Sequence, residues 1–213
     1  MSLPSPTVFL VDDDDSVLRA LGRLIKSAGY KVQTFVSARG FLDSGDFKRG
    51  PACLVLDVRM PGLNGLDLQQ ELQAANVTPP IIFITGHGDI PTTVRAMKAG
   101  AVDFLPKPVK DAVLLRAIEQ ALARAMRDHA ERRELETLSQ RVNALTPRER
   151  EVMALVVSGL LNKQIAFELG TVEKTIKVHR ARVMQKMGVD SLAELVRVAE
   201  KIAVPPKSKQ AAT

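Results

Sequence analysis

The chain has 213 residues, of which 46% are hydrophobic, and a formal net charge of +6. This length and composition suffice to bury the cores of two small domains. The chain has a single cysteine, Cys53, so it cannot form an internal disulfide, which is compatible with a reducing compartment. Cys53 lies inside an apolar run, which indicates a buried thiol. The N-terminus lacks a basic start followed by an apolar stretch, and no apolar run approaches the ~20 residues needed to span a bilayer. We therefore expect a cytoplasmic protein with no part in a membrane.

The positive charge is concentrated near the C-terminus. Residues 1–125 carry 14 Lys and Arg against 13 Asp and Glu, and residues 126–143 carry four against four. The remaining excess of five positive charges falls in residues 144–213, which indicates that this part binds a polyanion. These differences predict a first domain over 1–125, a helical linker over 126–143 and a basic domain with a short tail over 144–213.

The first domain alternates apolar runs with helical patterns. The runs lie at 8–11, 32–36, 53–56, 81–84 and 102–105. Such alternation is typical of a five-stranded parallel sheet with helices on both faces, a doubly wound α/β fold. The last helical pattern begins near Lys110 and meets no Gly or Pro before Pro147, so we expect this helix to continue into the linker.

Polar residues follow four of the predicted strands: Asp12 and Asp13, then Asp57, Thr85 and Lys107. The carboxyl ends of parallel strands meet at one edge of the sheet, where α/β folds bind ligands. Crowded carboxylates require a cation, and oxygen ligands suit Mg²⁺, which is often shared with phosphate. We predict that Asp57 attacks phosphorus as a nucleophile, that the metal and Lys107 neutralise the phosphoryl oxygens, and that Thr85 hydrogen-bonds one of them.

The next two acids, Asp14 and Asp15, stand at the entry to a predicted helix. Asp is favoured at helix N-caps and in first turns. We expect these two residues to cap that helix and leave them out of the site.

Four segments of the first domain form a specific set: Val11–Asp13, Asp57–Gly65, Thr85–Asp89 and Lys107–Pro108. In this order and at these separations they resemble the receiver domain of two-component response regulators over residues 7 to about 125. The resemblance implies that a sensor histidine kinase phosphorylates Asp57.

The same resemblance implies roles for individual residues. Asp13 and Asp57 would bind Mg²⁺ directly, Asp12 would act through a water molecule, and the backbone of Arg59 would complete the metal site. Thr85 and Phe104 would form a switch pair, and Lys107 would contact the phosphoryl group.

The basic domain shows only helical patterns. Thr146 as N-cap, Pro147 and Glu149 form the pattern of a capping box, which predicts a helix that ends near Gly159. Further helices are predicted over 162–169, from Glu173 to Met187, and over 191–203. Two helices joined by a tight turn with glycine, the second of them basic, are typical of a helix-turn-helix.

The helix from Glu173 to Met187 is predicted to read DNA. Ile176, Val183, Met184 and Met187 form an inward stripe, so that the residues between them face out near the helix N-terminus, where a recognition helix contacts bases. A basic solvated face is the alternative. The candidate DNA contacts are Lys163, Lys174, Thr175, Lys177, Val178, Arg180, Ala181 and Arg182.

Residues 145–202 resemble the LuxR-type helix-turn-helix, through 145–149, 159–166, 175–180 and 194–196. One departure stands before the recognition helix, where the family has an apolar residue and then Ser but this chain has Thr171 and Val172. Valine is a poor N-cap. Either Thr171 caps the helix from one position earlier or the helix start is shifted.

The tandem of the two domains, with the segment 87–91, resembles the FixJ group of response regulators. This resemblance implies a transcription factor that binds double-stranded promoter DNA, forms a homodimer when phosphorylated and has RNA polymerase as a further candidate partner. We expect no enzymatic turnover.

Three alternatives remain open. Leu135, Leu138, Val142 and Leu145 form a short coiled-coil-like stripe that could join two linkers, or the linker could be a solvated single helix steadied by ion pairs. The metal site alone would also permit a phosphotransferase or hydrolase of small substrates. A degenerate receiver with constitutive DNA binding is the third alternative, and the intact Asp13, Asp57, Thr85 and Lys107 argue against it.

Overall fold

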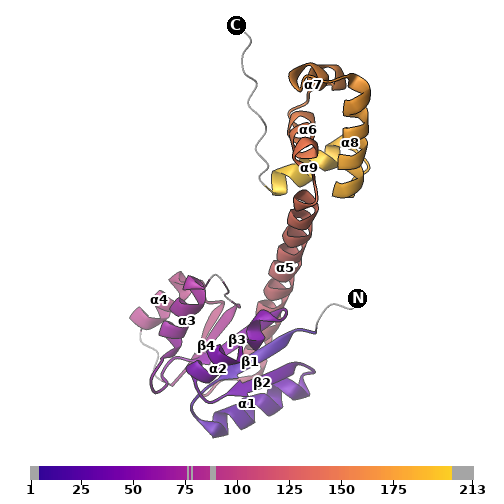
Figure 1. Ribbon diagram of the computed structural model, residues 1–213. Helices are drawn as coiled ribbons and strands as arrows, with labels where there is room; N and C mark the ends of the chain where they lie inside the picture. The colour runs from indigo at the N-terminus through magenta and orange to yellow at the C-terminus, as the bar shows by residue number, and fades with distance from the viewer. Residues whose placement is uncertain (1–4, 76, 78, 87–89, 203–213) are drawn as a thin grey trace. The chain divides into compact units, whose positions relative to one another are not determined.

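A computed structural model describes residues 5–75, 77, 79–86 and 90–202. The segment 87–89, which belongs to the receiver pattern, and residue 203 at the predicted end of the last helix lie outside these residues. The chain forms two compact units, Met1–Ala130 and Glu131–Thr213, and most of their helices and strands are labelled in Figure 1. No helix in the described part of the chain is long and apolar enough to cross a membrane.

The first unit contains a parallel sheet whose described strands stand in the order β2-β1-β3-β4-β5. They are β1 (Thr7–Val11), β2 (Lys31–Phe35), β3 (Ala52–Asp57), β4 (Ile81–Thr85) and β5 (Asp103–Pro106). The helices are α1 (Asp15–Ser27), α2 (Ala38–Ser44), α3 (Gly65–Ala74), α4 (Ile90–Lys98) and the part of α5 (Asp111–Asn143) up to Ala130, with a 3-10 turn at Asp46–Lys48. The predicted doubly wound fold is confirmed, and each strand begins and ends within one residue of its predicted run.

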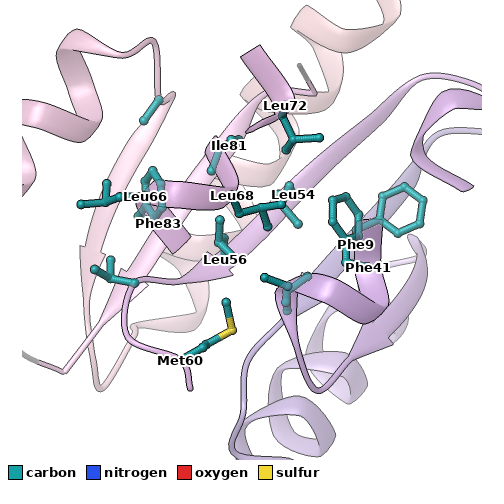
Figure 2. Close-up of a cluster of buried hydrophobic side chains, with 14 of the residues drawn as sticks. Phe9, Phe41, Leu54, Leu56, Met60, Leu66, Leu68, Leu72, Ile81 and Phe83 are labelled. Atoms are coloured by element: carbon teal, nitrogen blue, oxygen red, sulfur yellow. The ribbon is translucent and has the colours of Figure 1, made fainter. Parts of the chain in front are cut away.

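Two hydrophobic cores lie on opposite faces of the sheet. On one face Leu54 and Leu56 pack in a cluster with residues of α2, α3 and α4 (Figure 2). On the other face Cys53 and Val55 pack in a cluster with residues of α1 and α5. Successive residues of a strand point to opposite faces, so β3, which is buried along its whole length, contributes to both cores. The cores thereby fix the end of β3, where Asp57 lies.

Cys53 is fully buried, as the sequence predicts, and burial raises the pKa of its thiol to about 12. A thiol that stays protonated in a core behaves as a small apolar side chain. Cys53 therefore serves the packing of β3.

A buried glutamine joins α3 to the end of α4. The side-chain amide of Gln69 donates to the backbone oxygens of Ala96 and Ala99, at 3.3 and 3.0 Å. The last carbonyl groups of a helix have no partner within that helix, and here a neighbouring side chain satisfies them. Gln69 thus holds the C-terminal end of α4 against α3.

The second unit contains α6 (Pro147–Val157), α7 (Asn162–Glu168), α8 (Glu173–Met187) and α9 (Leu192–Lys201). The expected capping box is confirmed: the Thr146 hydroxyl accepts from the Glu149 N–H, and the Glu149 carboxylate accepts from the Thr146 N–H. Val152, Ile165 and Ile176 come from three different helices and meet in one core.

The linker stripe is largely used inside the second unit. Leu138 and Leu145 are buried, and Val142 packs against the core formed by α6 to α9, whereas Leu135 is exposed. α5 reaches Asn143 without a break, as its lack of Gly and Pro predicts. Because most of the stripe is buried within its own chain, little apolar surface is left for a coiled coil between two linkers.

Candidate functional site

Asp12, Asp57 and Lys107 meet at the carboxyl edge of the sheet. The Lys107 ammonium lies 2.6 Å from an oxygen of Asp12 and 2.8 Å from an oxygen of Asp57. Asp12 is fully buried and Asp57 is 5% exposed. The structure therefore brings together three of the predicted site residues, which lie at or just beyond the ends of three different strands.

Local hydrogen bonds fix the Asp57 carboxylate and the turn behind it. One carboxylate oxygen of Asp57 accepts from the Arg59 N–H at 2.8 Å. The Val58 N–H donates to Ile84 at the end of β4, and the Val58 carbonyl accepts from Gly65 at the start of α3. Gly65 packs so closely that a methyl group there would collide with the Asp57 carbonyl oxygen. The glycine is needed because the turn passes directly over the backbone of Asp57.

Burial and charge act against each other at this cluster. Burial raises the pKa of the Asp57 carboxyl above its usual value, and the hydrogen bond and charge of Lys107 only partly offset this rise. Burial by itself lowers the pKa of Lys107, but the bonds to Asp12 and Asp57 outweigh it, so the net shift is upward. Lys107 therefore remains a cation between two carboxylates.

The predicted metal ligands are only partly gathered. Asp12 and Asp57 are side by side around Lys107, while Asp13 is exposed at the next position along the chain. The part of the chain that the structure describes contains no group of three or more His, Cys, Asp or Glu side chains that could hold a metal ion. The available donors are all oxygens, which fit a hard divalent cation.

The predicted switch residues lie on β4 and β5. Thr85 is buried at the end of β4, and its carbonyl accepts from the Lys107 N–H at 2.7 Å. Phe104 is half-buried in β5, with its ring centroid 6.0 Å from that of Phe83. Asp14 lies outside the cluster and caps α1 through the Ser16 N–H, as expected.

The second unit presents the candidate DNA contacts on α7 and α8. All eight candidate DNA contacts are exposed or half-buried: Lys163 on α7, and Lys174, Thr175, Lys177, Val178, Arg180, Ala181 and Arg182 on α8. The Arg180 guanidinium donates to the Asn162 side chain at 3.3 Å, which joins α8 to the start of α7. Lys177 pairs with Glu173 one turn earlier, at 3.2 Å.

The start of α8 follows neither of the two alternatives, because Thr171 does not cap the helix and the helix start is not shifted. Val172 is the N-cap and makes no side-chain capping bond, and the helix begins at Glu173, where the sequence places it. The Thr171 N–H instead closes the end of α7 by donating to Ala166 at 2.9 Å. The recognition helix therefore keeps its predicted start but lacks the side-chain cap that Ser would supply.

An ionic contact that the sequence pattern does not predict joins α8 to the start of α6. The Lys186 ammonium donates to a carboxylate oxygen of Glu149 at 2.6 Å, and Glu149 is 2% exposed. The hydrogen bond from Lys186 is the main cause that lowers the pKa of Glu149 to about 2, with the Thr146 N–H as the next. The sequence signalled only the capping role of Glu149, since its partner lies 37 residues away.

Comparison with known proteins assigns both units. A family model for the response regulator receiver domain matches residues 8–119, and a model for bacterial regulatory proteins of the luxR family matches residues 143–199. Nodulation protein W of Bradyrhizobium diazoefficiens is 51% identical over 197 residues, which cover 92% of this chain and 86% of that protein. Transcriptional regulatory protein FixJ of Azorhizobium caulinodans is 44% identical over 206 residues, which cover 96% of this chain and 95% of that protein.

A solved structure agrees with these relatives. The response regulator StyR has a TM-score of 0.86 and 52% sequence identity, and the match covers 93% of this chain and 100% of that chain. The chain belongs to the response regulators that join a receiver domain to a LuxR-type DNA-binding domain. It is a phosphorylation-controlled transcription regulator of a two-component system, from a family of transcription regulators and not of enzymes. The family implies a histidine kinase, DNA and a divalent metal used in phosphorylation.

The pair of Glu149 and Lys186 should make the stability of the second unit depend on pH. The pKa of Glu149 is lowered from its ordinary value of 4.5 to about 2. Its contribution is therefore fully present above about pH 4.5 and is lost as the pH falls towards 2. Glu149→Gln should lower the urea midpoint at neutral pH, and this difference from the wild type should shrink between about pH 5 and about pH 2.

Glu151→Gln is the matched control, because Glu151 is two residues away and forms a more exposed ion pair with Arg148. That variant should follow the wild type at each pH. A difference between Glu149→Gln and the wild type that stays constant with pH would contradict the assigned pair.

Proposed function

We propose that Asp57 accepts a phosphoryl group from the phosphohistidine of a sensor histidine kinase in a reaction that uses Mg²⁺. The observation that carries this proposal is the Lys107 ammonium bound to both Asp12 and Asp57 at the carboxyl edge of the sheet. A carboxylate beside a fixed cation can approach an anionic phosphoryl group, because the cation offsets the repulsion between them.

The transfer would proceed in one displacement. An oxygen of Asp57 forms a bond to phosphorus, the bond from phosphorus to the histidine nitrogen breaks, and the imidazole keeps the electron pair. Lys107 would then contact a phosphoryl oxygen, and the Arg59 N–H would keep the carboxylate oriented. Asp12, Asp13, Asp57 and the backbone of Arg59 would hold the metal, whose charge neutralises phosphoryl oxygens.

We further propose that the charge added at Asp57 changes the conformation of the face formed by α4, β5 and α5. Thr85 would follow the phosphoryl oxygens, and Phe104 would turn into the space that Thr85 leaves. α4 carries Ile90, Val94 and Met97 at helical spacing, and all three side chains are exposed, Ile90 by 80%. An apolar stripe of this kind is suited to contact with a second receiver.

The output would be binding of a homodimer to promoter DNA in the cytoplasm, with RNA polymerase as a further partner. Residues 1–125 would act as the receiver, 126–143 as a helical linker and 144–213 as the DNA-binding domain. Two recognition helices related by two-fold symmetry could reach half-sites about one turn of DNA apart. The pairing of two weak DNA-binding domains raises their combined affinity.

Asp57→Asn should abolish labelling by radioactive acetyl phosphate, because an amide is a far weaker nucleophile than a carboxylate. Asp111→Asn, at an exposed acid in the first turn of α5, is the control and should label as the wild type does. Labelling of Asp57→Asn that still requires Mg²⁺ would place the phosphorylation site elsewhere.

Two lysine variants should separate base contacts from phosphate contacts. Lys177→Ala should weaken binding to a selected DNA site by roughly 1–3 kcal/mol if Lys177 reads a base. Lys163→Ala should weaken binding to all sequences alike and reduce the salt slope by about one unit. Equal losses on selected and random DNA for Lys177→Ala would remove that residue from the set that reads bases.

Sedimentation with and without beryllofluoride tests the pairing of receivers. The wild-type chain at micromolar concentration should become dimeric with this phosphate mimic, and Val94→Asp should stay monomeric, because a charge would have to be buried in the contact. The Thr85→Ala variant should still accept phosphate on Asp57, but a smaller fraction of it should become dimeric. A chain that stays monomeric while its DNA affinity rises would show that phosphorylation acts by another route than pairing.

A further inference from the structure

The C-terminal ends of α5 and α8 are joined by side chains that each helix sends to the other. Arg141, in the last turn of α5, donates from Nη1 to the backbone oxygen of Met187, the last residue of α8, at 2.7 Å. Lys186, in the last turn of α8, donates from Nζ to the backbone oxygen of Ala144, just after α5, at 3.1 Å. Each helix thus supplies a cation to the end of its neighbour.

Cations stabilise the C-terminal ends of helices. The last carbonyl groups of a helix have no partner within it, and the helix dipole makes this end negative. Two such ends close together repel each other. Arg141 and Lys186 satisfy carbonyl groups at both ends and place positive charge between them.

The backbone of the turn after α8 leaves room for Arg141. Gly188 has φ +65°, a left-handed conformation that favours glycine, and closes α8. A Cβ atom at Gly188 would lie 2.8 Å from Nη1 of Arg141 and 3.1 Å from its Cζ, so a side chain there would displace the guanidinium. The glycine therefore serves both the turn and the close approach of Arg141.

The same contact extends to α6. Lys186 also binds the buried carboxylate of Glu149, near the start of α6, and Glu149 accepts from the Thr146 N–H. The end of α5, the start of α6 and the end of α8 are therefore joined in one cluster of polar contacts.

The opposite end of α8 has weaker local support. Its N-cap, Val172, makes no side-chain capping bond. The described polar contacts of the N-terminal half are the pair of Lys177 with Glu173 on α8 itself and the bond from Arg180 to Asn162. This half is held mainly by the buried side chain of Ile176, whereas the C-terminal end has polar contacts to both α5 and α6 in addition to the buried Val183 and Met187.

We propose that Arg141 is a positioning residue for DNA recognition, which acts on the recognition helix α8 by fixing its C-terminal end and does not touch DNA. This inference rests on the proposed role of α8 in reading bases. It also implies that the second half of the predicted linker belongs to the DNA-binding machinery.

The test uses the full-length protein with beryllofluoride and two DNA duplexes of equal length. One is selected from a random pool by the wild-type protein, and the other has random sequence. Arg141→Ala should lose about tenfold in affinity for the selected duplex, as one mismatched base pair would cause, and much less for the random one. Its salt slope should equal that of the wild type, since no phosphate contact is removed.

Two further variants serve as controls. Arg132→Ala removes the same charge from an exposed position of α5 and should keep the wild-type preference for the selected duplex. Arg141→Lys keeps a cation that can reach the Met187 carbonyl and should recover most of that preference. A thermal melt of each variant ensures that binding is measured on folded protein.

Several results would overturn the proposal. An equal loss of Arg141→Ala on both duplexes, with a salt slope lower by about one unit, would make Arg141 a phosphate contact. An unchanged preference for the selected duplex, with or without a lower melting temperature, would leave Arg141 with a purely structural role. A wild-type protein that selects no sequence would instead refute the proposed function, which separates the two failures.

Discussion

Two carboxylates buried at one edge of a sheet repel each other, and the Lys107 ammonium offsets this repulsion by binding both. The register of the sheet brings the two carboxylates together. β1 pairs with β3 so that Val11 and Leu56 are partners in register, which places the next residues, Asp12 and Asp57, side by side. Lys107 reaches them from beyond β5, and its N–H is bound to the end of β4. Four strands therefore have to be in place before this cluster exists.

The second unit solves a different electrostatic problem. The C-terminal ends of α5 and α8 lie close together, and their unsatisfied carbonyl groups would be costly without partners. Arg141 and Lys186 satisfy such groups across the sequence, and a third carbonyl, that of Asn143, accepts from Arg150 at 3.3 Å. The excess of basic residues in this part of the chain therefore serves the fold as well as the attraction of DNA.

Local patterns account for what the sequence could predict. The strands β1, β3 and β4 are almost fully buried, so each appears in the sequence as a short continuous apolar run. Thr146, Pro147 and Glu149 lie within four residues of one another and together mark the start of α6. The receiver site could be predicted because Asp12, Asp57 and Lys107 each follow a strand whose end is fixed by the fold. The placement of Asp13 beside a metal remains a prediction.

Contacts between distant residues could not be predicted in this way. Arg141 and Met187 are 46 positions apart, and the bond goes to a backbone oxygen that every residue type possesses. The stripe through Leu138 and Val142 has the spacing of a coiled coil. Tertiary packing decides whether this stripe contacts its own unit or a second chain. Pattern alone cannot decide between these two outcomes.

The buried position of Cys53 allows opening of the first unit to be measured through the reactivity of its thiol. The chain has one cysteine, which lies four residues before Asp57 on the central strand β3 and has no exposed surface. A thiol reagent can reach it only when the sheet of the first unit opens, so the labelling rate measures how often that opening occurs. The second unit has no cysteine and stays silent to the reagent. The wild-type sequence can thus distinguish loosening of the receiver from loosening of the DNA-binding unit without an added probe.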